Sequence, residues 1–143
     1  NEKGETALHR ACIDGNLKKV KSLVAEGHPV NPRDFCGWLP LHEACNHGHV
    51  SVVEYLLEAG AWINDRGGER CGGVTPLIDA ANCGHLDVVK LLVEKGAQVM
   101  ARDDDGNTAL DSLRSWYSRT GDVLELADEV EYKKVEKMLL NVA

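Results

Sequence analysis

The feature that most limits how this chain can fold is a repeat of about 33 residues. The segment GETALHRA, which begins at Gly4, recurs as GWLPLHEA from Gly37, 33 residues later. It recurs again as GVTPLIDA from Gly73 and as the shorter GNTALD from Gly106, after steps of 36 and 33 residues. Such a period is typical of a solenoid, in which each unit covers the apolar face of its neighbour.

Each of the first three copies continues with an apolar stripe at helical spacing. A spacing of three and four residues puts each stripe on one face of a helix. Gly27, Gly60 and Gly96 follow the stripes and predict where those helices end. The stripes are Leu17/Val20/Leu23/Val24, Val50/Val53/Leu56/Leu57 and Leu86/Val89/Leu92/Val93. A turn and two antiparallel helices per unit predict an all-α ankyrin-repeat solenoid of four repeats with an extended C-terminal capping unit.

We expect a single ankyrin-repeat domain over residues 1–143, with units at approximately 1–36, 37–72, 73–105 and 106–143. In the first three units a valine of the second helix follows the turn glycine by 16 residues, whereas Val135 follows Gly106 by 29. The fourth unit therefore carries a 13-residue insertion. The segment from Glu125 to Leu140 predicts a final helix, and we expect Trp116 to pack in this cap.

Several chemistry-bearing residues belong to the repeat pattern itself. Cys12 and Cys45 share one repeat position and are expected to fill the core. His9 and His42 are expected to satisfy backbone groups. The five cysteines include no CxxC pair, which argues against a zinc site or a disulfide framework and favours a reducing compartment. No cofactor or metal is expected.

Charge and hydropathy exclude further classes of function. The net charge of −7 argues against direct binding of nucleic acid, which needs clustered Lys and Arg. No apolar stretch approaches the ~18 residues of a membrane span, and no signal peptide opens the chain. Cys36 or Cys45 with His42 could suggest a thiol nucleophile, which needs a base at hydrogen-bonding distance and a water-excluding pocket. Cys45 is expected to be core and no segment resembles a catalytic loop, so we expect no enzyme.

Ankyrin units form a concave groove between their turn tips and their first helices. Trp38 follows a turn glycine with no core within reach, so we expect it to be exposed and to take part in binding. The first-helix positions that face the groove are Arg10, Ile13, Asp14, Glu43, Asn46, His47, Asp79, Asn82 and Cys83, and those at the tips are Glu5, Asp34, Trp38, Val74, Asp103 and Asn107.

Asp34, Trp38, Glu43, Asn46 and Asp79 are expected to converge on one patch. Carboxylates and an amide can accept all three N–H donors of a lysine ammonium, while an indole shields its alkyl stem. Each methyl group on the lysine removes a donor, so such a site selects the unmethylated form. The alternative interpretation is that the acidic residues only solvate the helix faces.

At these residues the sequence resembles the ankyrin domains of the Tonsoku-like family. The resemblance rests on NEKGET.LHRACI, GHP.NPRD.CGW.PLHEACN.GH and TPL.DA.NCGH, which stand here at Asn1–Ile13, Gly27–His49 and Thr75–His85. It implies a nuclear, chromatin-associated reader of the histone H4 N-terminal tail that recognises an unmethylated lysine. Such a reader marks newly replicated chromatin for homologous-recombination repair, and it can bind the tail within a histone H3–H4 complex held by another chaperone.

The resemblance also implies roles for particular residues. Asp34, Trp38, Glu43 and Asn46 match the lysine-reading pocket, and Trp38, Glu43, Asn46 and Asp79 match the positions that hold a neighbouring histidine of the tail. His47 departs from the aromatic residue expected there, and Ile78 replaces the repeat histidine. Further matching groove positions are Glu5, Asn82 and Cys83, with Phe35 and Cys36 on the tip beside them.

A second hypothesis keeps the fold and changes the partner. The tip of the third unit is three residues longer than its counterpart and is polar, with Arg66, Glu69 and Arg70. A generic ankyrin scaffold would bind a folded, non-histone protein through this tip or through the convex face. Substitutions in the groove would then leave partner binding unchanged.

Overall fold

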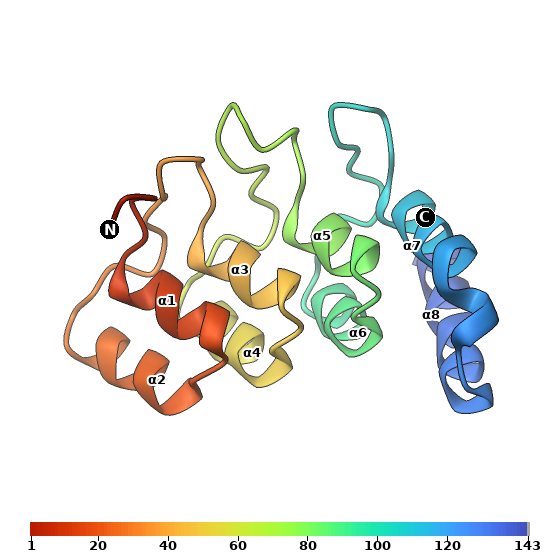
Figure 1. Cartoon of the computed structure of the whole chain (residues 1–143), viewed down its shortest axis with the longest axis horizontal. Coiled ribbons are helices and arrows are strands. Elements are labelled where there is room, and N and C mark those ends of the chain that lie inside the picture. The colour runs from red at the N-terminus through yellow and green to blue at the C-terminus, as the bar shows by residue number, and fades with distance from the viewer. Residues whose placement is uncertain (143) are drawn as a thin grey trace.

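Residues 1–142 are described by the computed structural model, in which four two-helix units stack side by side (Figure 1). Within this part of the chain every element is helical, and the predicted all-α ankyrin solenoid is confirmed. The helices are α1 (Ala7–Asp14), α2 (Leu17–Ala25), α3 (Pro40–Asn46), α4 (Val50–Glu58), α5 (Pro76–Asn82), α6 (Leu86–Glu94), α7 (Ala109–Thr120) and α8 (Leu126–Val142), with a 3-10 turn η1 (Gly121–Val123) between the last two.

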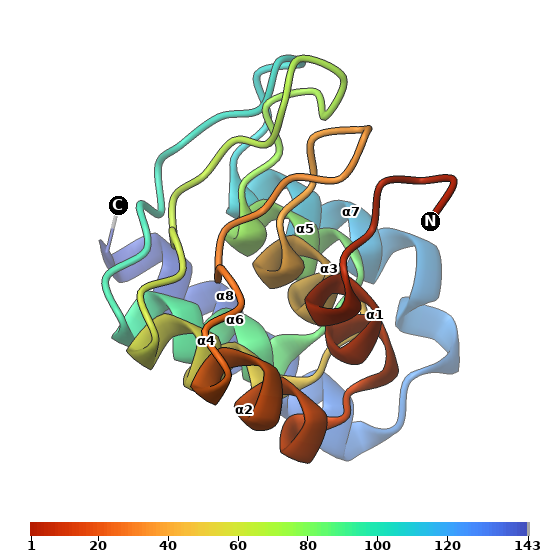
Figure 2. The same ribbon diagram turned by 90° about the vertical axis from the view of Figure 1, so that its left-hand side faces the viewer.

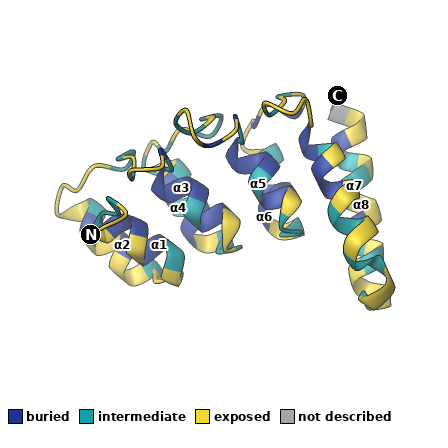
Figure 3. Cartoon of the chain, turned by 45° about the horizontal axis from the view of Figure 1, so that its top comes forward, coloured by how far each residue is buried: buried dark blue, intermediate teal, exposed yellow. Residues whose placement is uncertain are grey.

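The helices form two layers below a row of turn tips (Figure 2). The first helices α1, α3, α5 and α7 pack on one another in chain order, and each contacts the second helix of its own unit. The tips project above the first helices (Figures 1 and 2), and two cavities lie along the stack where the tips meet these helices. Burial is concentrated where the units meet, as Figure 3 shows.

Side-chain caps and prolines fix where the first helices begin. The hydroxyls of Thr6, Thr75 and Thr108 accept hydrogen bonds from the backbone N–H three residues later, which satisfies donors that the first turn leaves free. Pro40 and Pro76 stand in the first turn of α3 and α5, where a missing N–H costs nothing.

A ladder of aromatic rings ties each unit to the next. Gly15 ends α1 at φ +69°, and the ring of His49 from the following unit lies directly against it. His49 Nε2 donates to the carbonyl oxygen of Ile13 at 2.9 Å. His85 covers Gly48 in the same way, and Trp116 covers the equivalent glycine of the third unit, so the predicted packing of Trp116 in the cap is confirmed.

The core follows the repeat pattern. Cys12 and Cys45 are fully buried, as predicted, and burial together with the charge of Glu43 raises the pKa of Cys12 to about 12. The histidine prediction is also confirmed. His9 Nδ1 accepts from the N–H of Thr6 at 3.1 Å, and His42 Nδ1 accepts from the N–H of Leu39 at 3.2 Å.

The insertion in the fourth unit is helical. The first helix α7 has 12 residues, against 8, 7 and 7 in the earlier first helices, and the second helix α8 has 17, against 9 in each earlier second helix. The predicted final helix is therefore present as α8, which packs on α6 and α7. Tyr117 stacks on the buried Tyr132 with ring centroids 4.0 Å apart, which joins α7 to α8.

None of the helices described here has both the length and the apolar composition that crossing a membrane requires.

Candidate peptide-binding groove

An acidic or amide side chain shapes the first, second and fourth tips. Asp34 Oδ1 accepts the backbone N–H groups of Cys36, Gly37 and Trp38 at 2.9 to 3.0 Å. Asn1 and Asp103 do the same in their own units. Asp34 therefore has a structural role that the sequence analysis missed, although an Asx residue shortly before a turn glycine is its usual signal. One carboxylate oxygen of Asp34 remains for a ligand.

Trp38 is held from three sides. His9 Nε2 donates to its carbonyl oxygen at 2.8 Å, and the ring of His42 meets the indole edge-on with centroids 5.0 Å apart. A Cβ on Gly67 would lie 3.5 Å from the indole, so the third tip backs the ring. The expectation of an exposed tryptophan without a packing role is wrong, because Trp38 is half-buried by these neighbours.

The longer third tip lies against the second. Gly68 N–H donates to the carbonyl oxygen of Gly37 at 3.1 Å, and a Cβ on Gly37 would stand 2.5 Å from Gly68 Cα. Arg33 forms a two-pronged ion pair with Asp65 at 2.7 and 2.9 Å. The sequence analysis noted the extra length of this tip but not its contact with Trp38, for which the glycine pair was the available signal.

Three carboxylates meet beside Trp38. One oxygen each of Glu5, Asp34 and Glu43 lie within 4.8 Å of one another. Glu5 accepts from Asn1 Nδ2 at 2.9 Å and lies 3.5 Å from Arg10. Glu43 differs, because no hydrogen-bond donor among the described residues reaches its carboxylate, although its side chain is only 18% exposed.

The electrostatics of the groove follow from this crowding. Burial raises the pKa of Glu43 to about 7, and the charges of Asp34, Glu5 and Asp79 add to the shift. Burial also raises the pKa of Asp79, against a hydrogen bond from Asn46. A cation that arrives between these groups would relieve the repulsion and replace the missing donor of Glu43.

A small cavity of about 180 Å³ adjoins the carboxylates, lined by Trp38, His42, Glu43, Asn46 and Asp79. Its amide is already oriented, because Asn46 Nδ2 donates to Asp79 Oδ1 at 3.0 Å. The five residues expected to converge therefore lie in two adjoining groups that share Glu43.

The remaining residues of the candidate site lie along the same groove or on its rim. Asn82 is exposed on α5, and Cys83 is half-buried with its sulfur 3.9 Å from Asp79. The ring of His47 stacks on His49 and lies 3.8 Å from Glu43. Phe35 is 74% exposed and covers Gly4, and Cys36 is exposed beside it.

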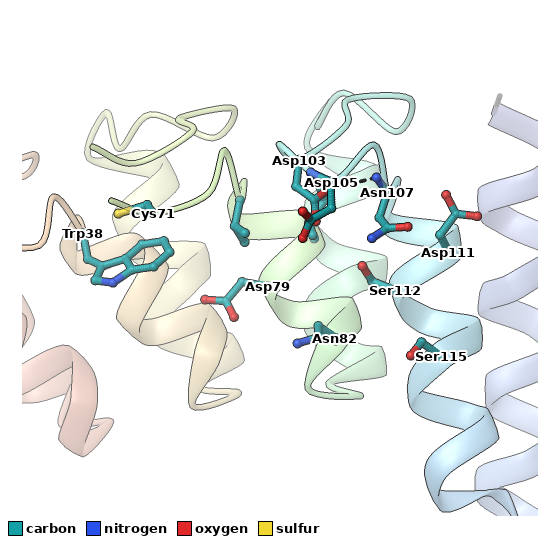
Figure 4. Close-up of a pocket in the computed structure, with 12 residues that line it drawn as sticks. Trp38, Cys71, Asp79, Asn82, Asp103, Asp105, Asn107, Asp111, Ser112 and Ser115 are labelled. Carbon is teal, nitrogen blue, oxygen red and sulfur yellow. Dashed lines mark hydrogen bonds between the residues drawn. The ribbon is translucent and has the colours of Figure 1, made fainter. Parts of the chain in front are cut away.

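The sequence analysis missed a larger cavity farther along the groove. It has a volume of about 460 Å³ and lies between α5 and α7 below the fourth tip (Figure 4). Asp105, Asp111, Ser112 and Ser115 line it, and none of them was singled out from the sequence. The degenerate fourth copy of the repeat gave no signal for these positions.

Comparison with known proteins places these features in a family. A model of ankyrin repeats in three copies matches residues 1–67, and a model of ankyrin repeats in many copies matches residues 63–112. The chain is 54% identical over 142 residues, 98% of its length, to the Tonsoku-like protein of Drosophila melanogaster. It is 62% identical over 116 residues, 81% of its length, to that of Mus musculus.

A shorter match covers 42 residues, 29% of the chain, at 50% identity to the SMC5-SMC6 complex localization factor protein 1 of Homo sapiens, of which it spans 4%. The chain spans only 8 to 10% of the length of the Tonsoku-like relatives that it matches.

Proposed function

The chain belongs to the ankyrin-repeat family, and from that premise we propose that it holds the N-terminal tail of histone H4 in its acidic groove. Ankyrin repeats are protein-interaction modules, so a protein partner follows from the family alone. The acidic groove supports a basic, extended partner, and the resemblance to Tonsoku-like proteins suggests the histone. We propose binding without catalysis.

The observation that carries the proposal is the state of Glu43. A largely buried carboxylate with no hydrogen-bond donor and two acidic neighbours is unfavourable in the unbound protein. A lysine ammonium supplies three donors and one positive charge to this position. Trp38 stands beside it and can shield the methylene stem of the lysine.

The same geometry supports selection of the unmethylated lysine. Glu5, Asp34 and Glu43 each offer at least one carboxylate oxygen towards the shared position. Each methyl group would replace an N–H donor and leave one of these acceptors unpaired. One half-buried indole also falls short of the aromatic cage that accepts methylated lysines.

The small cavity supports a second contact with the tail. Glu43, Asn46 and Asp79 line it, and an imidazole could donate to their oxygens. This fits a histidine next to the lysine, as the resemblance implies. We extend the proposal to its setting: a nuclear, chromatin-associated module that marks newly replicated chromatin for homologous-recombination repair, with the tail presented by a histone H3–H4 complex on another chaperone.

The scaffold hypothesis remains the second candidate. Glu69 and Arg70 are exposed on the third tip and are available to a folded partner. Arg66 is less available, because it donates to the carbonyl oxygen of Arg102 at 2.6 Å and pairs with Asp104 at 3.3 Å. That arginine joins the third tip to the fourth.

A calorimetric methyl scan tests the proposal. The chain is titrated with the unmodified H4 tail peptide and with peptides that are dimethylated at one lysine at a time. We expect the unmodified peptide to bind and one methylated position to abolish binding. Equal binding of all peptides would mean that the groove binds basic peptides without selecting the methylation state. No binding of any peptide would favour the hypothesis of a scaffold for a non-histone protein.

Three variants connect the result to the groove. Trp38→Ala should weaken binding by at least ~2 kcal/mol, as for tryptophans at interface hot spots. Glu43→Gln should abolish the methyl preference because it removes the unpaired charge. Glu54→Gln makes the same change on the exposed surface of α4 and should leave binding unchanged. A loss below ~0.5 kcal/mol for Trp38→Ala would remove the tryptophan from the site.

A further inference from the structure

The cavity between α5 and α7 is acidic on several sides. Asp79 comes from α5, Asp103 and Asp105 from the fourth tip, and Asp111 from the first turn of α7 (Figure 4). No lysine or arginine of residues 1–142 lines it. Arg119 donates to the carbonyl oxygen of Asn82 and to Ser115 Oγ, which leaves the four carboxylates unpaired.

Internal hydrogen bonds use only part of this acceptor capacity. Asp79, Asp103 and Asp111 each accept through one oxygen, from Asn46 Nδ2, from backbone N–H groups of the fourth tip and from Thr108, respectively. The other oxygen of each is free, and the Asp105 side chain makes no hydrogen bond within the described residues. A ligand with several donors would find acceptors on three elements.

A second, independent observation comes from Ser112. The residue is only 9% exposed, and its hydroxyl, which is not itself buried, has no hydrogen-bond partner among the described residues and lines the cavity. In Figure 4 this hydroxyl points from α7 towards α5, into the cavity. A hydroxyl that opens into the cavity and has no partner among the described residues can donate to or accept from a bound group.

We propose that this cavity binds an arginine side chain of the same peptide whose lysine lies beside Glu43. The inference rests on the proposed peptide-binding function. A guanidinium carries five donors in a planar fork, which suits acceptors spread over α5, α7 and the fourth tip. The volume of about 460 Å³ is more than twice the 180 Å³ of the neighbouring cavity and fits this larger group.

One peptide can reach both places because the two cavities share a wall. Trp38 and Asp79 line both of them, and Val74 and Ile78 offer apolar contact for the methylene stem. The lysine position among Glu5, Asp34 and Glu43 lies between α1 and α3, whereas the large cavity lies between α5 and α7, two helix spacings farther along. At roughly 8–10 Å per spacing and 3.3 Å per extended residue, the arginine is expected about five to six residues from the lysine.

The test follows backbone amide signals of the whole chain by NMR during titration with N-acetyl-arginine methylamide. The citrulline compound, which has the same shape without the charge, and the lysine compound serve as matched ligands. We expect the arginine compound to shift Ser112, Asp105 and Asn107, and the citrulline compound to bind at least about fivefold more weakly. Equal shifts with citrulline, or stronger binding of the lysine compound at these signals, would overturn the assignment.

Two variants localise the effect. Asp105→Asn combined with Ser112→Ala removes one free carboxylate and the unpartnered hydroxyl, and should abolish the preference for arginine over citrulline. Glu69→Gln removes one charge from the exposed third tip, outside the lining, and should retain it. An equal loss in both variants would reduce the effect to the general negative charge of the tips.

The H4 tail is titrated in parallel to separate the two proposals. If the arginine compound binds at Ser112 and the tail does not bind at all, the cavity assignment stands and the histone proposal fails. If the tail binds and the arginine compound leaves Ser112 unmoved at millimolar concentration, the histone proposal stands and the cavity assignment fails.

Discussion

At the scale of single residues, Glu43 links folding to binding. Its carboxylate is largely buried and has no hydrogen-bond donor among the described residues, and the carboxylates of Glu5 and Asp34 crowd it, while the ring of His47 stays 3.8 Å away. The same crowding of carboxylates disfavours the charged form of Glu43 in the free protein and favours the binding of a cation beside it. Its protonation should therefore affect stability and affinity in opposite directions.

The first prediction concerns the affinity for a lysine-containing peptide. Glu43 has a pKa of about 7 in the free protein, and a bound ammonium favours its charged form, so binding releases a proton. The association constant should rise by up to about fivefold from pH 6 to pH 7 and about tenfold from pH 6 to pH 8, and level off above that. Calorimetry in buffers of different ionisation enthalpy measures both the affinity and the released proton.

The peptide used should contain no histidine, because a histidine would itself titrate between pH 6 and pH 8 and change the measured affinity. Glu43→Gln should bind weakly and without this pH dependence. A parent chain whose affinity stays constant from pH 6 to pH 8 would show that Glu43 does not meet the cation.

The second prediction concerns the free energy of unfolding. The pKa of Glu43 is raised in the folded chain above its usual 4.5, so the folded state holds the proton more tightly. Stability from this group is fully present below pH 4.5 and is lost as the pH rises through about 7. Glu43→Gln should therefore stabilise the chain by about 1–3 kcal/mol at pH 8 and hardly at all at pH 4.5.

Urea unfolding of both chains at the two pH values measures this difference. Glu54→Gln, on the exposed face of α4, should leave the unfolding free energy nearly unchanged at both. A Glu43→Gln variant that is less stable than the parent at pH 8 would contradict the picture of a strained carboxylate.

At the scale of elements, the conformation of the tips has a different origin from that of the helices. Each helix follows from a pattern in its own sequence, whereas the conformation of the third tip depends on its contacts with the second tip. Its Gly68 lies against Gly37 of the second tip, and its Gly67 backs the indole of Trp38. The extra length of this loop thus supports the neighbouring unit.

The third prediction separates this contact from ordinary backbone strain. Gly37 and Gly60 have φ values of +102° and +98°, so alanine is strained at both. A Cβ on Gly37 would meet Gly68 Cα at 2.5 Å, whereas a Cβ on Gly60 would meet nothing within 4 Å. Gly60→Ala should cost about 1 kcal/mol of unfolding free energy, and Gly37→Ala at least about 1 kcal/mol more.

Gly37→Ala should also weaken peptide binding because it displaces the support of Trp38, while Gly60→Ala should not. Chemical denaturation and peptide titration of the two variants measure both effects. Equal costs in stability and equal affinities would mean that the third tip does not brace the second.

The difference between helices and tips explains which features the sequence could predict. The helices, the buried Cys12 and Cys45 and the bonded His9 follow from a pattern repeated three times, so each copy supports the interpretation of the others. The half-burial of Trp38 depends on the longer third tip, which occurs only once in the sequence, so the repeat pattern could not predict it. The cavity beside Ser112 depends on how a degenerate unit packs on a regular one.

At the scale of the whole molecule, the negative charge is placed where the partner is proposed to lie. The chain carries a net charge of −7, and carboxylates of the groove come from the first tip to the last helix pair. Long-range attraction should therefore steer a basic peptide towards the groove before any pocket is filled.

The fourth prediction follows from this field. The association rate for a basic peptide should fall by about fivefold to tenfold between 50 and 300 mM salt, and the dissociation rate should change much less. Stopped-flow tryptophan fluorescence, to which Trp38 of the groove contributes, measures both rates. Asp122→Asn, a neutral substitution on the exposed turn η1, controls for net charge. A salt effect confined to the dissociation rate would contradict steering.

The support of Trp38 has a consequence for inheritance and engineering. Its carbonyl is bound by His9 of the first unit, its ring meets His42 of its own unit, and its back rests on Gly67 of the loop that leads to the third unit. No single 33-residue unit carries the pocket. Shuffling or duplicating the unit of residues 37–72 would separate the tryptophan from His9, from Glu5 and Asp34 of the first unit, and from Asp79 of the third. The smallest block that can be transplanted with its specificity is the first three units together.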